Sequence, residues 1–240
     1  MHDAAPAEAP QRPADLEAFA RDLAALRAEL EAAIGPEDLE HLRKMERWGR
    51  WCSALGYGTA WIAPNPLSAL LIAQGSTARW TIVMHHVGHR AYDRVPGVPE
   101  HYRSGRFAAG KRRYLDFLDW IDPEAWRREH NAMHHARTGD PGDPDLVQRN
   151  TEWLRRSSLP RPLKLAIVGF YACTWKLVYY APNTFQLHRR NVQRRRGEAG
   201  GDRDERVDDI RYLAPFNPLT EEGRAFLRTC VLPYAAARFV

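Results

Sequence analysis

The hydrophobic pattern of the chain centres on a run of 28 residues, Trp51 to Ala78, that contains no charged side chain. One membrane-spanning helix needs about 20 residues, so the run is longer than one such helix and shorter than two. Pro64-Asn65-Pro66 interrupts it, which predicts two tilted helices at about 48–63 and 67–84. Basic residues flank both ends and favour a transmembrane hairpin that starts and ends in the cytoplasm. A helical hairpin buried in a soluble bundle is the alternative.

Residues 14–47 predict amphipathic N-terminal helices. Asp15 is expected to cap the first helix, and Gly35-Pro36 to end it and open the second. The first helix carries a single apolar stripe at helical spacing, formed by Leu16, Phe19, Leu23, Leu26, Leu30 and Ile34. We expect this stripe to pack against the rest of the chain, with a coiled coil or the membrane surface as alternatives. Residues 1–13 are rich in Ala and Pro, are expected to be disordered and do not resemble a secretory signal peptide.

The rest of the pattern is also helical, so the predicted fold class is all-α. Asp122 is an N-cap candidate, with Pro123 at the first position of its helix. Residues 163–188 form an apolar segment with basic clusters on both sides, which leaves open whether it crosses, re-enters or lies on a membrane. A charged linker is expected at 189–222, with Thr220 as the cap of a last segment at 223–240. The apolar residues of that segment predict the start of a truncated transmembrane helix.

Composition narrows the class of protein. The net charge is +5 and the mean hydropathy is −0.55. A positive charge of this size fits binding to nucleic acid, binding to an anionic membrane surface, or simply a solvent-exposed basic face. The chain has no nucleic-acid motif and its basic residues flank apolar segments, so we favour the membrane and expect no nucleic-acid partner. Arg outnumbers Lys and Ala is frequent, which indicates a GC-rich bacterial genome. The three cysteines are isolated, which rules out the usual cysteine zinc patterns.

Six of the ten histidines lie in two short groups, His85, His86 and His89 in MHHVGHR and His130, His134 and His135 in EHNAMHH. Residues four apart share one face of a helix, so each group can present two imidazoles to one point. His135 lies further round and can join them if the helix is distorted or ends there. Neither group has the Glu of a zinc-protease helix. Five or more imidazoles exceed the needs of one tetrahedral zinc and suit two iron ions better, although ligand type alone leaves copper open.

At these residues the chain resembles the membrane-bound fatty acid desaturase family, in a bacterial branch. His85 and His89 match its first histidine box, H-x-x-x-H, and His130, His134 and His135 match its second. The flanking HRAYDRVPGVP, DPDL and TWKLVYYAPNT also agree, and the resemblance runs from about Arg79 to the C-terminus. It implies that these five histidines bind a di-iron centre. Outside the boxes, His86, which is three residues before His89 and could replace His85, and His188 are further metal-ligand candidates.

The resemblance also implies a desaturase-like domain over 48–240. A transmembrane hairpin at 48–84 would carry a helical cap with the histidine boxes, 85–162, on the cytoplasmic side of the bacterial inner membrane. The activity implied is an O₂-dependent desaturase that introduces a cis double bond into a fatty acyl lipid or acyl thioester. Its partners would be membrane lipids and a separate ferredoxin- or rubredoxin-like electron donor.

The family's third box, [HQ]-x-x-H-H, has no match between Arg149 and Val240. We therefore interpret the chain as the N-terminal portion of a longer protein, and expect it to be incomplete and inactive alone. A hydroxylase or ketolase on the same scaffold, or a non-catalytic His-rich membrane metal-binding fragment, are the alternative functions. The acidic residues Asp140, Asp143 and Asp145 are interpreted as a loop with turn prolines; a hydrogen bond to the free N–H of a ligand histidine is the second option.

Overall fold

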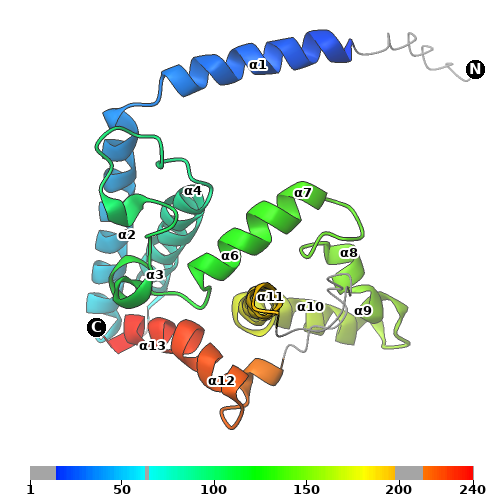
Figure 1. Ribbon diagram of the computed structural model, residues 1–240. Coiled ribbons are helices and arrows are strands. Elements are labelled where there is room, and N and C mark those ends of the chain that lie inside the picture. Colours follow the sequence, from blue (N-terminus) through cyan, green and yellow to red (C-terminus); the bar gives the residue numbers. More distant parts are fainter. Residues whose placement is uncertain (1–14, 63–64, 198–212, 240) are drawn as a thin grey trace, which may run out of the picture.

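The computed structural model of the chain describes residues 15–62, 65–197 and 213–239 (Figure 1), and every regular element in these ranges is a helix. The predicted all-α class is therefore confirmed. Residues 1–13, which are expected to be disordered, and residues 198–212 of the expected charged linker lie outside the described residues.

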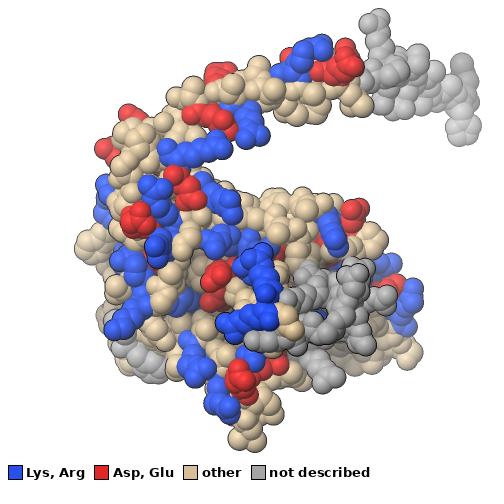
Figure 2. Space-filling view, viewed as in Figure 1, with Lys and Arg blue, Asp and Glu red and all other residues tan. Residues whose placement is uncertain are grey.

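The chain begins with α1 (Leu16–Ala32), which reaches out from the rest of the molecule (Figures 1 and 2). Asp15 caps it as expected, because its side chain accepts a hydrogen bond of 2.9 Å from the backbone N–H of Ala18. None of its residues is buried among the described part of the chain. The expectation that its apolar stripe packs against the rest of the chain is therefore wrong for the five residues on the helix, and among the stripe residues only Ile34, beyond the end of α1, packs against the core.

The next two helices form an antiparallel pair. α2 (Pro36–Ala60) and α3 (Pro66–Thr77) pack along each other, and Asn65 caps α3 by accepting a 2.8 Å hydrogen bond from Ser68 N. α2 starts earlier than the hairpin helix predicted at 48, because nothing between the amphipathic segment and Trp51 interrupts the helix. Within the described residues, no helix combines the length and the apolar character that crossing a membrane requires. The transmembrane hairpin at 48–84 therefore stays a prediction.

α3 continues without a break into the first histidine group. A π-helical segment, η1 (Ala78–Met84), leads into the short helix α4 (His85–Gly88). The following stretch is an extended loop region with short helical turns, η2 (Glu100–Tyr102), η3 (Gly110–Arg112) and α5 (Arg113–Asp116).

The second histidine group lies on one continuous helical rod. α6 (Pro123–Glu129) is followed by a π-helical turn, η4 (His130–His134), and by α7 (His135–Arg137). Asp122 caps α6 as predicted, since its side chain accepts a 2.8 Å hydrogen bond from Ala125 N.

The C-terminal half supplies the remaining helices. They are α8 (Val147–Asn150), α9 (Glu152–Arg156), α10 (Arg161–Trp175), the π-helical η5 (Lys176–Tyr180), α11 (Ala181–Arg195), η7 (Ala214–Phe216), α12 (Glu221–Phe226), the π-helical η8 (Leu227–Val231) and α13 (Leu232–Phe239). α11 packs on α6, and residues 189–195, expected to belong to the charged linker, are its last residues. Thr220 caps α12 as predicted.

The main hydrophobic core lies where these helices meet the two histidine groups. Val83, Met84 and Val87 enter it from η1 and α4, Trp126 from α6 and Tyr180 from η5. Leu42 of α2 is also part of it, and a smaller cluster joins α11 to α12 and η8. Because the helices that carry the histidines pack through this core, burial of apolar side chains determines the relative position of the two groups.

Candidate metal centre

The first two imidazoles, those of His85 and His89, come from the end of the long α3–η1–α4 rod. Their Nε2 atoms lie 3.1 Å apart. The rod can approach α6 closely because position 88 is a glycine. A Cβ atom at Gly88 would lie 2.5 Å from Cζ3 of Trp126, well inside contact distance. Gly88 therefore lets the Trp126 indole, whose ring centroid is 5.1 Å from that of His85, lie against the first histidine group.

The second group owes its arrangement to the π-helical turn η4. In an α-helix, the side chains of residues i and i+5 point in well-separated directions. A π turn has i→i+5 hydrogen bonds and brings these two positions near each other. The ring centroids of His130 and His135 are 4.6 Å apart, and those of His130 and His134 are 5.0 Å apart. The π turn is thus the distortion that allows His135 to join the group.

The two groups meet around His130. Its ring centroid lies 5.2 Å from that of His85 and 5.1 Å from that of His89, and His135 lies 4.9 Å from His89. Two sets of potential ligand atoms each fall within 4.8 Å of one another: His85, His89 and His130, and then His130, His134 and Asp145. The five histidines that match the two boxes therefore converge on one place from segments about forty residues apart in the sequence.

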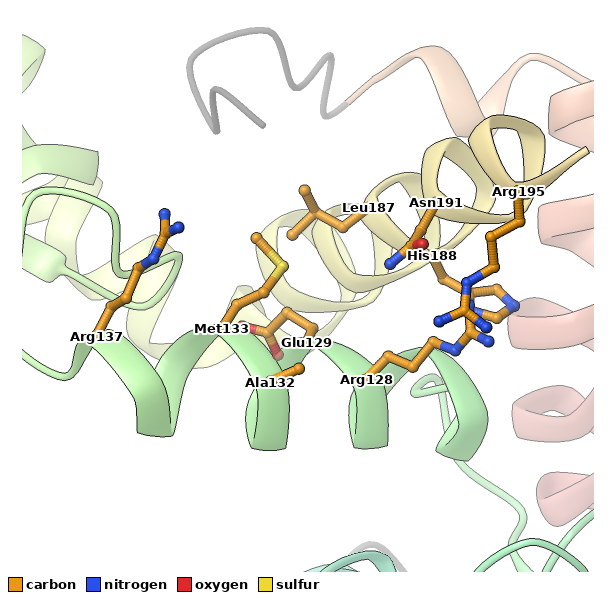
Figure 3. A pocket seen from close by; sticks show the side chains of 9 residues that line it. All are labelled: Arg128, Glu129, Ala132, Met133, Arg137, Leu187, His188, Asn191 and Arg195. Carbon is orange, nitrogen blue, oxygen red and sulfur yellow. The ribbon is translucent and has the colours of Figure 1, made fainter. Parts of the chain in front are cut away.

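The two further candidates lie apart from this convergence. His86 is exposed, and its ring centroid is 6.0 Å from that of His85. His188 lies on α11, where it lines a cavity together with Arg128 and Arg195 (Figure 3). Neither histidine belongs to the close sets of ligand atoms found among the described residues.

The protonation states of His85 and His130 favour the binding of a metal cation. Both ring nitrogens of His130 are buried without a hydrogen-bond partner in the described chain. Burial, followed by the charge that His135 would carry, lowers the pKa of His130 to about 3. Burial, followed by His89, lowers the pKa of His85 to about 4. Neutral imidazole is the form that binds a metal, and unpaired buried nitrogens call for a partner. The residues therefore fit a transition-metal site.

Asp143 orients one of the histidines. Its carboxylate lies 2.8 Å from Nδ1 of His134 and accepts backbone hydrogen bonds from Gly139 and Asp145. A carboxylate on one ring nitrogen selects the tautomer and leaves Nε2 available for a metal. This acidic stretch forms a loop as predicted, and within that loop Asp143 also makes the contact with a candidate ligand histidine that was the second option.

A buried polar network surrounds the site on the α11 side. The Trp126 indole donates to the hydroxyl of Tyr180 at 3.0 Å, and that hydroxyl lies 3.4 Å from Oδ2 of Asp145. The same Asp145 oxygen is 3.9 Å from Nδ1 of His134. Asn131 donates to the backbone carbonyl of Gly88 at 2.9 Å and so ties η4 to α4. These contacts hold the two histidine segments in one position relative to each other.

Glu129 was not singled out by sequence analysis, although it directly precedes His130. Its side chain is 1% exposed, and neither carboxylate oxygen has a hydrogen-bond partner in the described residues. Burial, followed by the charges of Asp145 and Asp143, raises its pKa well above the usual value. It faces a cavity of about 230 Å³ between the α6–α7 rod and α11 (Figure 3). A cation nearby would stabilise this carboxylate.

The comparisons with known proteins agree with the histidine pattern. The family model described as fatty acid desaturase matches residues 59–208, a range that contains all five converging histidines as well as Glu129, Asp143 and Asp145. Neither the curated proteins nor the solved structures yielded a match. Since the matched range covers more than half of the sequence, the chain belongs to the fatty acid desaturase family.

Proposed function

We propose that the chain is the histidine-box portion of an O₂-dependent di-iron enzyme that introduces a cis double bond into a fatty acyl chain. Membership of the family implies oxidoreductase activity in lipid metabolism. The observation that carries the proposal is the convergence of five imidazoles around His130, whose ring nitrogens are both buried and unpartnered.

The iron would be held by His85, His89, His130, His134 and His135. Ligand type supports iron, because the five imidazoles are more than one zinc ion can use. Neutral imidazoles also leave positive charge on the metal ions and leave coordination positions open for oxygen. When bound, two iron ions with O₂ supply an oxidant strong enough to remove two hydrogens from an unactivated C–H pair, with water as the other product.

The chain's own residues prepare that site. Burial keeps the imidazoles of His85 and His130 neutral, and Asp143 orients His134 so that its other ring nitrogen stays available. Trp126 packs over His130 with ring centroids 4.3 Å apart and an angle of 22° between the planes, which shields this imidazole from water. His86 and His188 stay further candidates, His188 through the cavity that it shares with Glu129.

The substrate we propose is a fatty acyl lipid or acyl thioester at the bacterial inner membrane, with the histidine boxes on the cytoplasmic side. Exposed apolar residues on α2, α3 and α10 support a lipid environment; they include Trp51, Leu55, Leu67, Leu70, Leu165 and Phe170. Electrons would come from a separate ferredoxin- or rubredoxin-like donor.

The first test is metal content. Because the ligand set is expected to be incomplete, we expect the chain to bind Fe²⁺ weakly in an anaerobic titration, and His130→Ala to remove that binding. The matched control is His41→Ala, which changes an exposed histidine on α2. If wild-type chain holds no more iron than His130→Ala, the proposal is refuted.

The second test is the acyl composition of cells that express the chain with a ferredoxin and its reductase. A new double bond that disappears in His130→Ala supports desaturation, whereas an added hydroxyl or keto group would point to the related hydroxylases and ketolases. Unchanged acyl chains, together with bound iron, would agree with the expectation that residues 1–240 are inactive alone.

A further inference from the structure

The helix α1 exposes an apolar stripe that nothing in the described chain covers. Its five large apolar residues, Leu16, Phe19, Leu23, Leu26 and Leu30, are between 49% and 73% exposed. Among the described residues, the helix contacts the rest of the chain near its C-terminal end, where Glu31 pairs with Arg94 at 2.7 Å and the following Ile34 packs against the core. Figure 2 shows it extending freely from the rest of the molecule.

The spacing of the stripe is that of a coiled coil. Successive apolar residues are separated by three, four, three and four positions, which places Leu16, Leu23 and Leu30 at heptad position a and Phe19 and Leu26 at position d. The neighbouring e and g positions carry no large apolar residue. A helix that packs on its own protein normally has a wider apolar face, whereas this narrow seam is typical of a two-stranded coiled coil.

We propose that α1 pairs in parallel with α1 of a second copy of this chain. In a parallel pair each g residue faces the e residue of the partner's next heptad. Here Asp22 is at g and Arg27 is at the following e position, so the symmetric pair contains two Asp22–Arg27 contacts. An antiparallel pair would instead place the g residues, Asp22 and Glu29, near each other. Charge therefore favours the parallel orientation.

The contacts within one chain leave the seam accessible. Glu31, which pairs with Arg94 of the same chain, is at heptad position b, outside the a, d, e and g positions that face a partner. Arg27 also bonds to Glu31 at 3.0 Å, but such an exposed pair is weak and its guanidinium can contact Asp22 of the other copy as well. A two-fold axis along α1 would place both molecules at the same end of the pair.

A membrane surface suits this helix less well than a second copy. Its polar residues include four acids, Glu17, Asp22, Glu29 and Glu31, against two bases, Arg21 and Arg27. Helices that lie on anionic lipid carry mainly Lys and Arg on the polar face. The length of 17 residues, about 25 Å of helix, predicts a weak and concentration-dependent dimer.

Cysteine crosslinking of the full chain in detergent tests the pairing and its orientation. The variants Phe19→Cys, Leu26→Cys and the outer-face control Ala28→Cys would be made in a Cys173→Ser background, because Cys173 is exposed. We expect the first two each to form a disulfide dimer at least about tenfold faster than the control, since only seam positions come within disulfide reach. Crosslinking rates equal to that of the control would overturn the pairing. If a disulfide dimer formed only when Phe19→Cys and Leu26→Cys chains were mixed, the parallel orientation would be overturned.

Charge reversal provides an independent test by sedimentation equilibrium. Asp22→Arg and Arg27→Asp are each expected to weaken dimerisation by about tenfold at low ionic strength, and the double variant to restore it. Both side chains are exposed, so iron content should be unchanged in all three. A double variant as weak as the singles would overturn the proposed charge pairs.

Discussion

Gly88→Ala should disrupt the candidate metal centre without touching a histidine. The added Cβ would lie 2.5 Å from Cζ3 and 3.1 Å from Cε3 of Trp126, whereas carbon atoms in contact are about 3.5–4.0 Å apart. The indole would have to move by about 1 Å. It is 1% exposed and its N–H is bonded to Tyr180, so it has little freedom to do so. Overpacking of this kind costs about 1–3 kcal/mol.

The indole would also transmit the change to the histidines, because it stacks on His130. We therefore expect about tenfold weaker binding in an Fe²⁺ titration, in the range found when residues that support metal ligands are altered. Urea unfolding of the metal-free chain gives the stability change separately.

Gly58→Ala is the matched control, since Gly58 lies inside α2 and an added Cβ there meets no atom within 4 Å. It should stabilise the chain by up to about 1 kcal/mol through helix propensity and leave metal affinity unchanged. The reasoning is refuted if Gly88→Ala unfolds like Gly58→Ala and binds Fe²⁺ like wild type.

Four further predictions follow from other contacts. Gly75→Ala should lower stability by about 1–3 kcal/mol in urea unfolding, because its Cβ would lie 2.6 Å from the backbone oxygen of Gly49 and force α2 from α3; unchanged stability would contradict this packing. Asp143→Asn should weaken Fe²⁺ binding by about tenfold, because the charged partner of His134 is lost; an unaltered titration would argue against its orienting role. Lys176→Met should lower stability by about 2 kcal/mol, because it removes the salt-bridge partner of the buried Asp119 carboxylate. Adding Asp119→Asn should recover most of this lost stability in the same unfolding assay. The pKa of His85 is lowered from 6.5 to about 4, so between these pH values the unfolded chain binds more protons than the folded chain. The contribution of His85 to the stability of the metal-free chain should therefore be full above pH 6.5 and fall as the pH drops towards 4. His85→Ala should flatten this pH dependence of the free energy of unfolding.

The histidine boxes show how far spacing alone can go. His85 with His89, and His130 with His134, are four residues apart, so any α-helix would place each pair on one face. That the two pairs meet depends on contacts between segments distant in sequence, such as Asn131 with Gly88 and Trp126 with Tyr180. No local pattern encodes those contacts.

The carboxylates of the site illustrate a different limit. Asp143 stands in a D-P-G-D-P stretch whose residues favour turns, and only the folded loop brings it to His134. Glu129 follows two arginines on a helix and has the composition of a solvated face, yet packing of α11 on α6 buries it. Burial of a polar residue is decided by what packs over it, which the residue's own neighbours in sequence do not reveal.

The sequence by itself determined the all-helical class, the helix caps at Asp15, Asp122 and Thr220, and the five histidines that match the family's boxes. These depend on interactions within a few residues along the chain, so they can be inferred from local pattern. Only the tertiary structure decided that α1 stays exposed, that a π turn brings His135 towards His130, and that Gly88 admits Trp126 between the boxes. Each of these depends on the shape of a packed neighbour, and packing is a property of the whole fold rather than of any one segment.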